Sequence, residues 1–137
     1  MNDANQEINP TNTETRSQMT LEAPEQKLVS IDQFAEIELR VALVEEAESI
    51  PKSKKLLKLQ VFLGEKLGRR QILAGIAQYT SPEALIGKKI IVVANLQPAT
   101  LMGLQSQGML LAVQNEDSSK VEVIQAPEGF EPGARIR

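Results

Sequence analysis

The side chains best equipped for chemistry lie in two stretches of the chain, one basic and one polar. Between Lys52 and Arg70 there are seven bases and a single acid, Glu65. Clustered ammonium and guanidinium groups attract phosphates, so this segment predicts a basic patch suited to nucleic acid. A solvated lysine-rich face that only keeps the protein soluble is the alternative, and composition leaves both interpretations open.

The polar stretch connects two short apolar runs, residues 90–94 and 109–113. Both runs lack polar alternates and are too short for free-standing helices, which is typical of buried strands. Between them, Pro98 removes a backbone donor, and Gly103 and Gly108 permit backbone angles closed to other residues. Hydrogen-bonding groups come from Asn95, Gln97, Gln105, Ser106 and Gln107. We therefore expect a loop that carries function.

Two methionines, Met102 and Met109, flank the end of this connection. An exposed methionine is a soft, adaptable apolar contact, and beside amides and a hydroxyl it could fit an irregular polar surface such as a folded RNA. Ordinary packing in a core or an interface is the alternative.

The residue inventory favours a binding module over an enzyme. The chain has no cysteine and no histidine, so the commonest metal ligands, general bases and thiolate nucleophiles are missing. No phosphate-loop, metalloprotease or dinucleotide-binding motif is present. We expect no catalytic residue, no metal and no cofactor.

The formal charge of −3 comes from the first 27 residues, which carry five acids and two bases, while the remainder is balanced. Residues 1–27 are polar with little to bury, which predicts a disordered tail before a single domain at residues 28–137. No apolar run reaches membrane-spanning length and no secretion signal is evident, so we expect a cytoplasmic protein without membrane association.

The pattern after the tail predicts an all-β domain with short helices. A capping box at Ser30 and Gln33 starts a helix that ends near Glu36. Alternation then predicts a strand over residues 37–44, left by an acidic segment that leads to Pro51. A second strand buries Leu57, Leu59, Val61 and Leu63. A hairpin turn at residues 65–68 leads to a third strand at residues 69–74.

A second short helix is expected to separate the third and fourth strands, with Ser81 as its N-cap, Pro82 in its first turn and Gly87 as its stop. This order fits the five-stranded OB-fold, a Greek-key barrel. The glycine- and proline-rich residues 127–137 form a C-terminal extension. The apolar side chains of Phe130 and Ile136 in this extension need a surface to pack against. A second subunit would supply one, which predicts a homodimer.

The chain has few aromatic residues, only Phe34, Phe62, Phe130 and Tyr79. Single-strand binders stack bases on such rings, so their scarcity favours a structured RNA recognised through backbone and shape.

Several separate blocks of the sequence, in conserved order, resemble one family. They are ELRVALVEEAE, LLKLQVFLG, RRQILAGIAQYTSPEALIGKK and VANLQPATLMGLQSQGMLLA. The blocks look like the tRNA-binding domain found as a stand-alone bacterial protein and at the C-terminus of bacterial methionyl-tRNA synthetases. The resemblance covers about residues 29–137. It implies an OB-fold, a homodimer and binding of tRNA by shape, as a non-catalytic cofactor or chaperone of tRNA that works with an aminoacyl-tRNA synthetase.

The resemblance also implies a binding site. Lys55 stands at the lysine of the family's N-A-D-K-L turn, and residues 106–109 stand at its S-Q-G-M block. Together with the neighbouring bases, the predicted tRNA-binding residues are Lys52, Lys54, Lys55, Lys58, Ser106, Gln107, Gly108 and Met109. The turn departs from the family at Lys52 and Lys54, and the loop departs at Thr100 and Gln105, so the docking angle on tRNA can differ.

Two other functions fit the same fold. A bacterial family of dimeric, export-related chaperones binds peptides, but its members lack the blocks that stand here at residues 75–77 and 106–109, which favours tRNA. A scaffold or dimerisation module for a synthetase is the third hypothesis.

Overall fold

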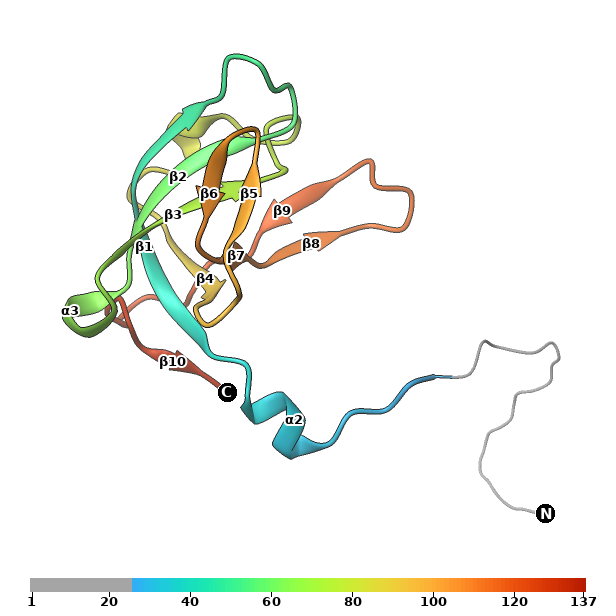
Figure 1. Cartoon of the computed structure of the whole chain (residues 1–137), viewed down its shortest axis with the longest axis vertical. Coiled ribbons are helices and arrows are strands. Elements are labelled where there is room, and N and C mark those ends of the chain that lie inside the picture. Colours follow the sequence, from blue (N-terminus) through green and yellow to red (C-terminus); the bar gives the residue numbers. More distant parts are fainter. Residues whose placement is uncertain (1–25) are drawn as a thin grey trace, which may run out of the picture. The chain divides into compact units, whose positions relative to one another are not determined.

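The strands of the barrel pair antiparallel in the order β3-β2-β1-β4-β7, in a computed structural model that describes residues 26–137 (Figure 1). They are β1 (Leu39–Ser49), β2 (Leu57–Phe62), β3 (Arg69–Ala74), β4 (Lys89–Val93) and β7 (Met109–Leu110). This topology confirms the predicted OB-fold. One compact unit runs from Ile31 to Arg137. Most of the predicted tail, residues 1–25, lies outside the described residues, and residues 26–30 have no regular secondary structure.

Strand β2 supplies the centre of the core. Its alternate residues Leu57, Leu59 and Val61 are each at most 1% exposed, and the residues between them are half-buried, as the sequence predicts. This is the pattern of a strand with one face on the core. From β4, Ile90 and Val92 complete the same apolar cluster, which also includes the third-strand residue Ile72.

Strand β1 is longer than the sequence predicts. It continues through the acidic segment to Ser49, because a register shift between Val44 and Glu46 carries it onward against β2. The core side of β1 consists of the small residues Ala42 and Val44, both fully buried, whereas Leu43 is half-buried. The side of β1 that packs on the core cluster therefore carries small residues, and Val41 on the other side is also buried, at 3% exposed.

In residues 26–137, three short helices accompany the strands: α2 (Ile31–Ala35) precedes β1, α3 (Gly64–Leu67) connects β2 to β3, and η1 (Pro82–Ala84) lies between β3 and β4. The predicted N-terminal ends of two helices are confirmed, since α2 begins at Ile31 and η1 begins at Pro82. At the start of η1, the Ser81 hydroxyl accepts a 3.3 Å hydrogen bond from the backbone N–H of Ala84. The predicted hairpin turn at residues 65–68 is wrong in type. A helical turn occupies it, closed by a 2.8 Å bond from Gly68 N–H to Gly64 O.

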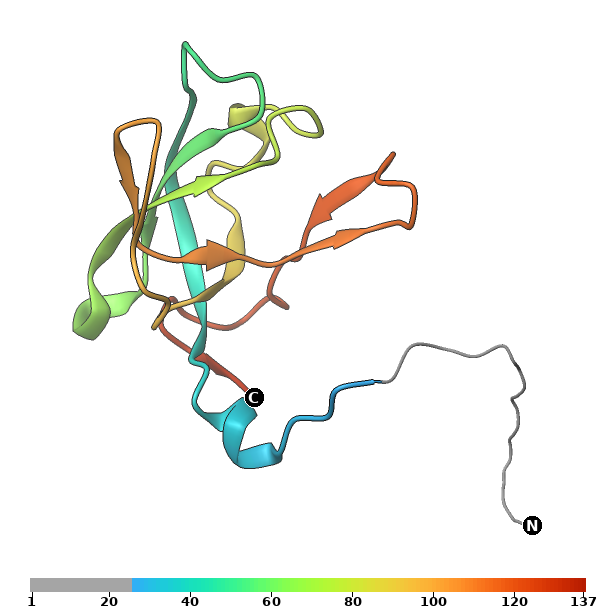
Figure 2. The ribbon, with the colours of Figure 1, turned by 45° about the vertical axis from the view of Figure 1, so that its right-hand side comes forward.

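The second apolar run is not one buried strand, which corrects the sequence interpretation. Only β7 stays in the barrel. The chain then leaves it as β8 (Ala112–Gln114), which pairs with β9 (Val121–Val123) in a hairpin that projects from the barrel (Figure 2). Val113 is 61% exposed. The run therefore serves two separate sheets, which local periodicity does not reveal.

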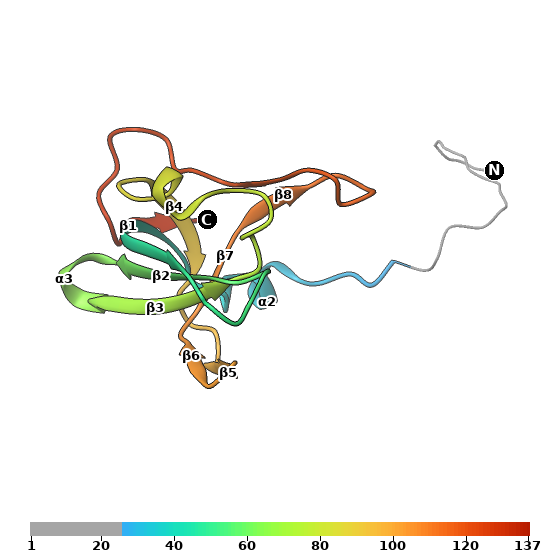
Figure 3. The ribbon, with the colours of Figure 1, turned by 90° about the horizontal axis from the view of Figure 1, so that it is seen from above.

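The connection before β7 contains a hairpin that the sequence did not predict. Strands β5 (Ala99–Leu101) and β6 (Leu104–Ser106) pair with each other. Seen from above, this hairpin lies outside the barrel beside β3 (Figure 3).

The C-terminal extension returns to the barrel. Strand β10 (Arg135–Ile136) pairs with the start of β1, and Gly133 N–H donates a 2.7 Å bond to Val41 O. Phe130 remains 52% exposed. Within residues 26–137, no helix is long and apolar enough to cross a membrane.

Candidate nucleic-acid interface

The connection between β1 and β2 holds three of the predicted lysines on a fixed backbone. Ser53 N–H donates to Ile50 O at 2.9 Å, and the Ser53 hydroxyl accepts from the N–H groups of Lys55 and Leu56 at 3.2 and 3.1 Å. The carbonyl of Lys55 accepts a 3.0 Å bond from Ala77 N–H. The polypeptide of this turn is thus held at several points while its side chains extend outward.

The three lysines Lys52, Lys54 and Lys55 are exposed. None of them has an ion-pair partner among residues 26–137. Three unpaired ammonium groups on one turn form a local positive charge that attracts a polyanion. We call these three residues the lysine turn.

Lys58 differs from the lysine turn although the sequence grouped them together. Its Nζ lies 2.9 Å from Oε2 of Glu48, which faces it across the β1–β2 ladder. The carboxylate offsets the charge of the ammonium group. Lys58 therefore contributes less positive potential to a ligand than its neighbours do.

The predicted single basic patch from Lys52 to Arg70 is wrong, because the β2–β3 hairpin separates its members. The pairing of Phe62 with Arg69 and of Leu57 with Ala74 puts Arg69 at the opposite end of the hairpin from the lysine turn. Arg69 forms two bonds to the Glu45 carboxylate, at 2.8 and 3.1 Å, and these raise the pKa of its guanidinium. The same guanidinium lies 4.7 Å from the centre of the Phe62 ring.

The S-Q-G-M block binds the free edge of β3. Ser106 is only 5% exposed, and its hydroxyl accepts a 3.0 Å bond from Leu73 N–H and donates a 3.1 Å bond to Gly108 O. Gln107 exchanges two bonds with the backbone of Gln71: its N–H donates to Gln71 O at 2.8 Å, and its Oε1 accepts from Gln71 N–H at 3.1 Å. We call these four bonds of Ser106 and Gln107 the β3 clamp.

The β3 clamp replaces a strand ladder with side chains. Strands β3 and β7 are not paired as a ladder, so the barrel is completed here by one backbone bond, from Gln107 N–H to Gln71 O, together with the Ser106 hydroxyl and the Gln107 side-chain amide. The bonds also satisfy the backbone N–H groups of Gln71 and Leu73, which would otherwise remain unpaired on an open edge of β3. The Ser106 hydroxyl and the side-chain oxygen of Gln107 are thus engaged within the protein, whereas the side-chain NH2 group of Gln107 makes no hydrogen bond within residues 26–137.

Gly108 and Met109 follow the clamp in different surroundings. A Cβ on Gly108 would lie 3.0 Å from Val93 O, so the close approach of β4 favours glycine at this position. Met109 pairs with Val93 in β7, yet its side chain is 47% exposed. Of the four residues in the block, only Met109 offers a side chain broadly to a ligand.

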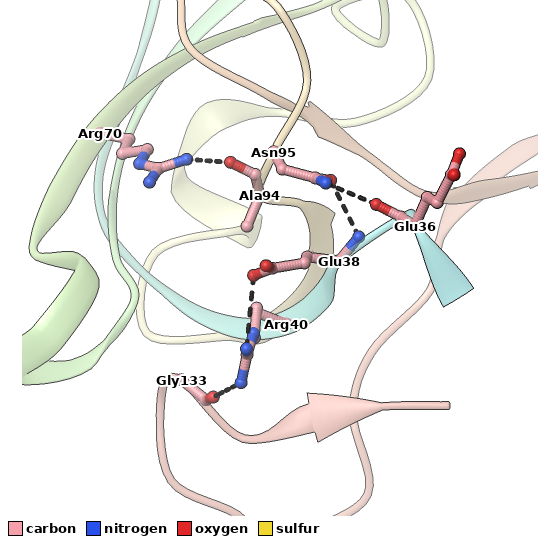
Figure 4. A network of polar contacts seen from close by, with 7 residues as sticks. All are labelled: Glu36, Glu38, Arg40, Arg70, Ala94, Asn95 and Gly133. Atoms are coloured by element: carbon pink, nitrogen blue, oxygen red, sulfur yellow. Dashed lines mark hydrogen bonds and ion pairs between the residues drawn. The ribbon is translucent and has the colours of Figure 1, made fainter. Parts of the chain in front are cut away.

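The start of the connection is anchored as firmly as its end (Figure 4). Asn95 accepts a 2.8 Å bond from Glu38 N–H and donates a 2.6 Å bond to Glu36 O, and the Arg70 guanidinium donates to Ala94 O. Arg70 is therefore a structural residue at this position. In the same close-up, Arg40 bonds the Glu38 carboxylate and Gly133 O at 3.3 and 3.2 Å, which ties the C-terminal extension to β1.

The hairpin of β5 and β6 is the feature of the site that the sequence analysis missed. Its tip, Met102-Gly103, is exposed, as is the preceding Leu101. The hairpin and the lysine turn project toward the same end of the barrel (Figures 1 and 2). The sequence does contain a signal for this hairpin, the two-residue segment Met102-Gly103 between the apolar residues Leu101 and Leu104.

No group of three or more metal-ligating side chains occurs within the described part of the chain. The candidate site consists of the lysine turn and the hairpin tip at one end of the barrel, with Met109 farther along it. Met109 pairs with Val93, which pairs with Leu39 at the start of β1, whereas the lysine turn follows the end of β1. Positive charge and adaptable apolar contacts suit an irregular, anionic surface.

The chain matches one family model over residues 39–135, described as "Putative tRNA binding domain". Among curated relatives, it is 51% identical over 109 residues to methionine–tRNA ligase of Clostridium acetobutylicum and 48% identical over 112 residues to that of Thermotoga maritima. These alignments cover 80% and 82% of this chain. The chain spans only 17% of the length of each ligase.

Solved structures show the same fold. A MetRS-related protein from Pyrococcus horikoshii is 43% identical, with a TM-score of 0.77 over 82% of this chain and 100% of that one. The CsaA chaperone protein from Picrophilus torridus is 29% identical, with a TM-score of 0.72 over 80% of this chain and 100% of that one.

Proposed function

Because the chain belongs to the tRNA-binding domain family, we propose that it binds tRNA by structure rather than by sequence, as a non-catalytic tRNA cofactor or chaperone. The observation that carries this proposal is the lysine turn, three exposed ammonium groups on an anchored backbone. Lysine contacts to phosphate position an RNA without reading its bases. The proposal places the protein in the cytoplasm, together with tRNA.

The aromatic residues support a structured RNA rather than a single strand. Phe62 is half-buried against Arg69, and the hydroxyl of Tyr79 donates to Ser118 O at 3.0 Å. Phe34 and Phe130 lie on α2 and in the C-terminal extension, away from the lysine turn in sequence and in element. Of these four aromatic residues, only Tyr79, which is 38% exposed, is tied closely to the lysine turn, through the bond of Ala77 N–H to Lys55 O. One ring does not make a platform for successive bases, whereas shape recognition requires none.

A working partnership with an aminoacyl-tRNA synthetase is part of the proposal. The similarity to a 17% segment of methionine–tRNA ligases supports it, since a separate chain could supply the same tRNA contacts in trans. The second candidate is peptide binding as a chaperone, which the likeness to the CsaA protein favours. The unpaired lysines favour a polyanion over a peptide.

Filter binding tests the proposal with two tRNAs of unrelated anticodon and one unstructured RNA of equal length. Both tRNAs should bind with similar affinity, and more tightly than the unstructured RNA. Three lysine–phosphate contacts predict a slope of about −2 to −3 for log affinity against log salt. Equal affinity for the unstructured RNA would contradict recognition by shape. Salt-insensitive binding of an unfolded polypeptide, without tRNA binding, would support the chaperone instead.

A further inference from the structure

The turn at the tip of the β5–β6 hairpin has an unfavourable residue in its first position. Leu101 pairs with Leu104, which leaves a two-residue turn of Met102 and Gly103 with φ angles of 52° and 76°. Positive φ at both central residues is the pattern of a type I′ turn, for which Asn-Gly is strongly preferred. Methionine has a Cβ and no local hydrogen bond to offset this backbone conformation.

Burial does not offset the strain at Met102. Its side chain is 51% exposed, and the neighbouring Leu101 is 40% exposed. A residue with a strained backbone and a largely exposed apolar side chain weakens the free protein, because little packing compensates for the strain. Such outliers are found at ligand contacts, where the side chain is held ready for its partner.

The hairpin is held rigidly enough to present this side chain. The β3 clamp fixes the end of β6, and Gln71 Nε2 donates a further 3.0 Å bond to Gln105 O. The tip projects toward the same end of the barrel as the lysine turn (Figures 1 and 2). Residues 50–56 and residues 99–106 contain no aspartate or glutamate, so neither segment carries a negative charge that would repel phosphates.

We infer that Met102 is an RNA-contacting residue, whose thioether packs against the exposed face of a base or ribose while the lysine turn holds the neighbouring phosphates. This inference rests on the proposed binding of tRNA. Base faces are apolar and flat, and a flexible, polarizable methionine side chain can cover one without reading its edges. The contact would add affinity without sequence preference.

The variants Met102→Asn and Met102→Gly test the inference, because both residues suit the turn better than methionine does. Each variant should melt at the wild-type temperature or above it. Each should bind tRNA about tenfold more weakly, as expected for the loss of one base-face contact. The same factor should appear at low and high salt, because the lost contact carries no charge. Leu96→Asn is the control: Leu96 is 45% exposed in the same connection and should leave affinity unchanged.

Methyl NMR supplies an independent readout, since the chain has only four methionines. With carbon-13 in the methionine methyl groups, the resonance that disappears in Met102→Gly should shift on addition of tRNA to the wild-type protein. A wild-type protein that binds tRNA while both variants bind equally well would overturn the inference and leave the proposed function standing. A lower melting temperature of Met102→Asn would overturn the strain argument. A wild-type protein that binds unfolded peptide and no tRNA would overturn both proposals.

Discussion

Lys55 and Lys66 carry the same charge at opposite ends of the β2–β3 hairpin. Lys55 belongs to the lysine turn, whereas Lys66 lies in α3, beside the end of the hairpin where Phe62 pairs with Arg69. Both side chains are exposed. This pair separates the local effect of a charge from its effect on the net charge of the protein.

We predict that Lys55→Glu weakens tRNA binding while it changes the free energy of unfolding by less than about 0.5 kcal/mol. The substitution replaces attraction to a phosphate with repulsion, so the loss of affinity should shrink as salt increases. Lys66→Glu makes the same change in net charge and should bind nearly as the wild type does. Filter binding over a salt series measures both. A loss at Lys55 that does not depend on salt would mean that its role is not electrostatic.

Met109 and Leu110 are neighbours in β7 with opposite exposure. Met109 is 47% exposed and Leu110 is 7% exposed, so the structure decides that Met109 does not belong to the core. We predict that Met109→Ala lowers stability by less than about 1 kcal/mol, whereas Leu110→Ala lowers it by about 2 to 5 kcal/mol.

The affinity of the folded Met109→Ala protein for tRNA should fall by a similar factor at every salt concentration. Thermal melts combined with filter binding test this pair of effects. A large drop in melting temperature together with unchanged tRNA affinity would return Met109 to a packing role.

At the scale of the element, the β5–β6 hairpin depends on the β3 clamp. We predict that Ser106→Ala destabilises the protein by about 1 to 3 kcal/mol, because it leaves the buried N–H of Leu73 without its acceptor. Amide hydrogen exchange should accelerate at Leu73 and through β5 and β6, ahead of β2. Gln105→Ala serves as the control, because the side chain of Gln105 is exposed and the bond from Gln71 Nε2 uses only the backbone carbonyl of Gln105. Unchanged protection at Leu73 in Ser106→Ala would contradict the clamp.

The clamp also changes how a loss of RNA binding at Ser106 is interpreted. Its hydroxyl already makes two bonds within the protein, to Leu73 N–H and Gly108 O. Weaker tRNA binding by Ser106→Ala would therefore follow from displacement of the hairpin tip and Met109. Hydrogen exchange distinguishes this indirect effect from a direct contact.

At the scale of the whole molecule, we predict a homodimer. Phe130 is 52% exposed, and a hollow of about 280 Å³ lies beside α2, lined by Ile31, Phe34, Ala35, Ile37, Arg135, Ile136 and Arg137. Burial of such apolar surface between two copies contributes about 25 cal/mol per Å². Light scattering at micromolar concentration should give twice the mass of the chain, and a monomer there would contradict the prediction.

The substitution Phe130→Asp should shift this dimer toward monomer. Deletion of residues 127–137 would be a less clean test of the dimer, because it would also remove β10 and the bond of Gly133 to Val41. Ile86→Asp is the control, since Ile86 is 47% exposed in the turn before β4. Its mass should remain that of the wild type.

The sequence by itself determined those features that depend on neighbouring residues. The alternation of Leu57, Leu59 and Val61 marks the inner face of β2, and Ser81 with Pro82 marks the start of η1. Periodicity and helix caps act over a few residues, so they can be recognised without knowing the rest of the fold. The OB-fold and the tRNA-binding family were recognised in the same way, from the order of local blocks.

The tertiary structure decided which polar groups remain available for a ligand. Glu48 lies opposite Lys58, and the edge of β3 takes up the hydroxyl of Ser106 and the side-chain oxygen of Gln107. The hairpin that exposes Met102, and the division of the basic segment between two ends of the barrel, also became visible only there. These contacts join residues as many as 36 positions apart, and their partners are set by strand register, which no local pattern specifies.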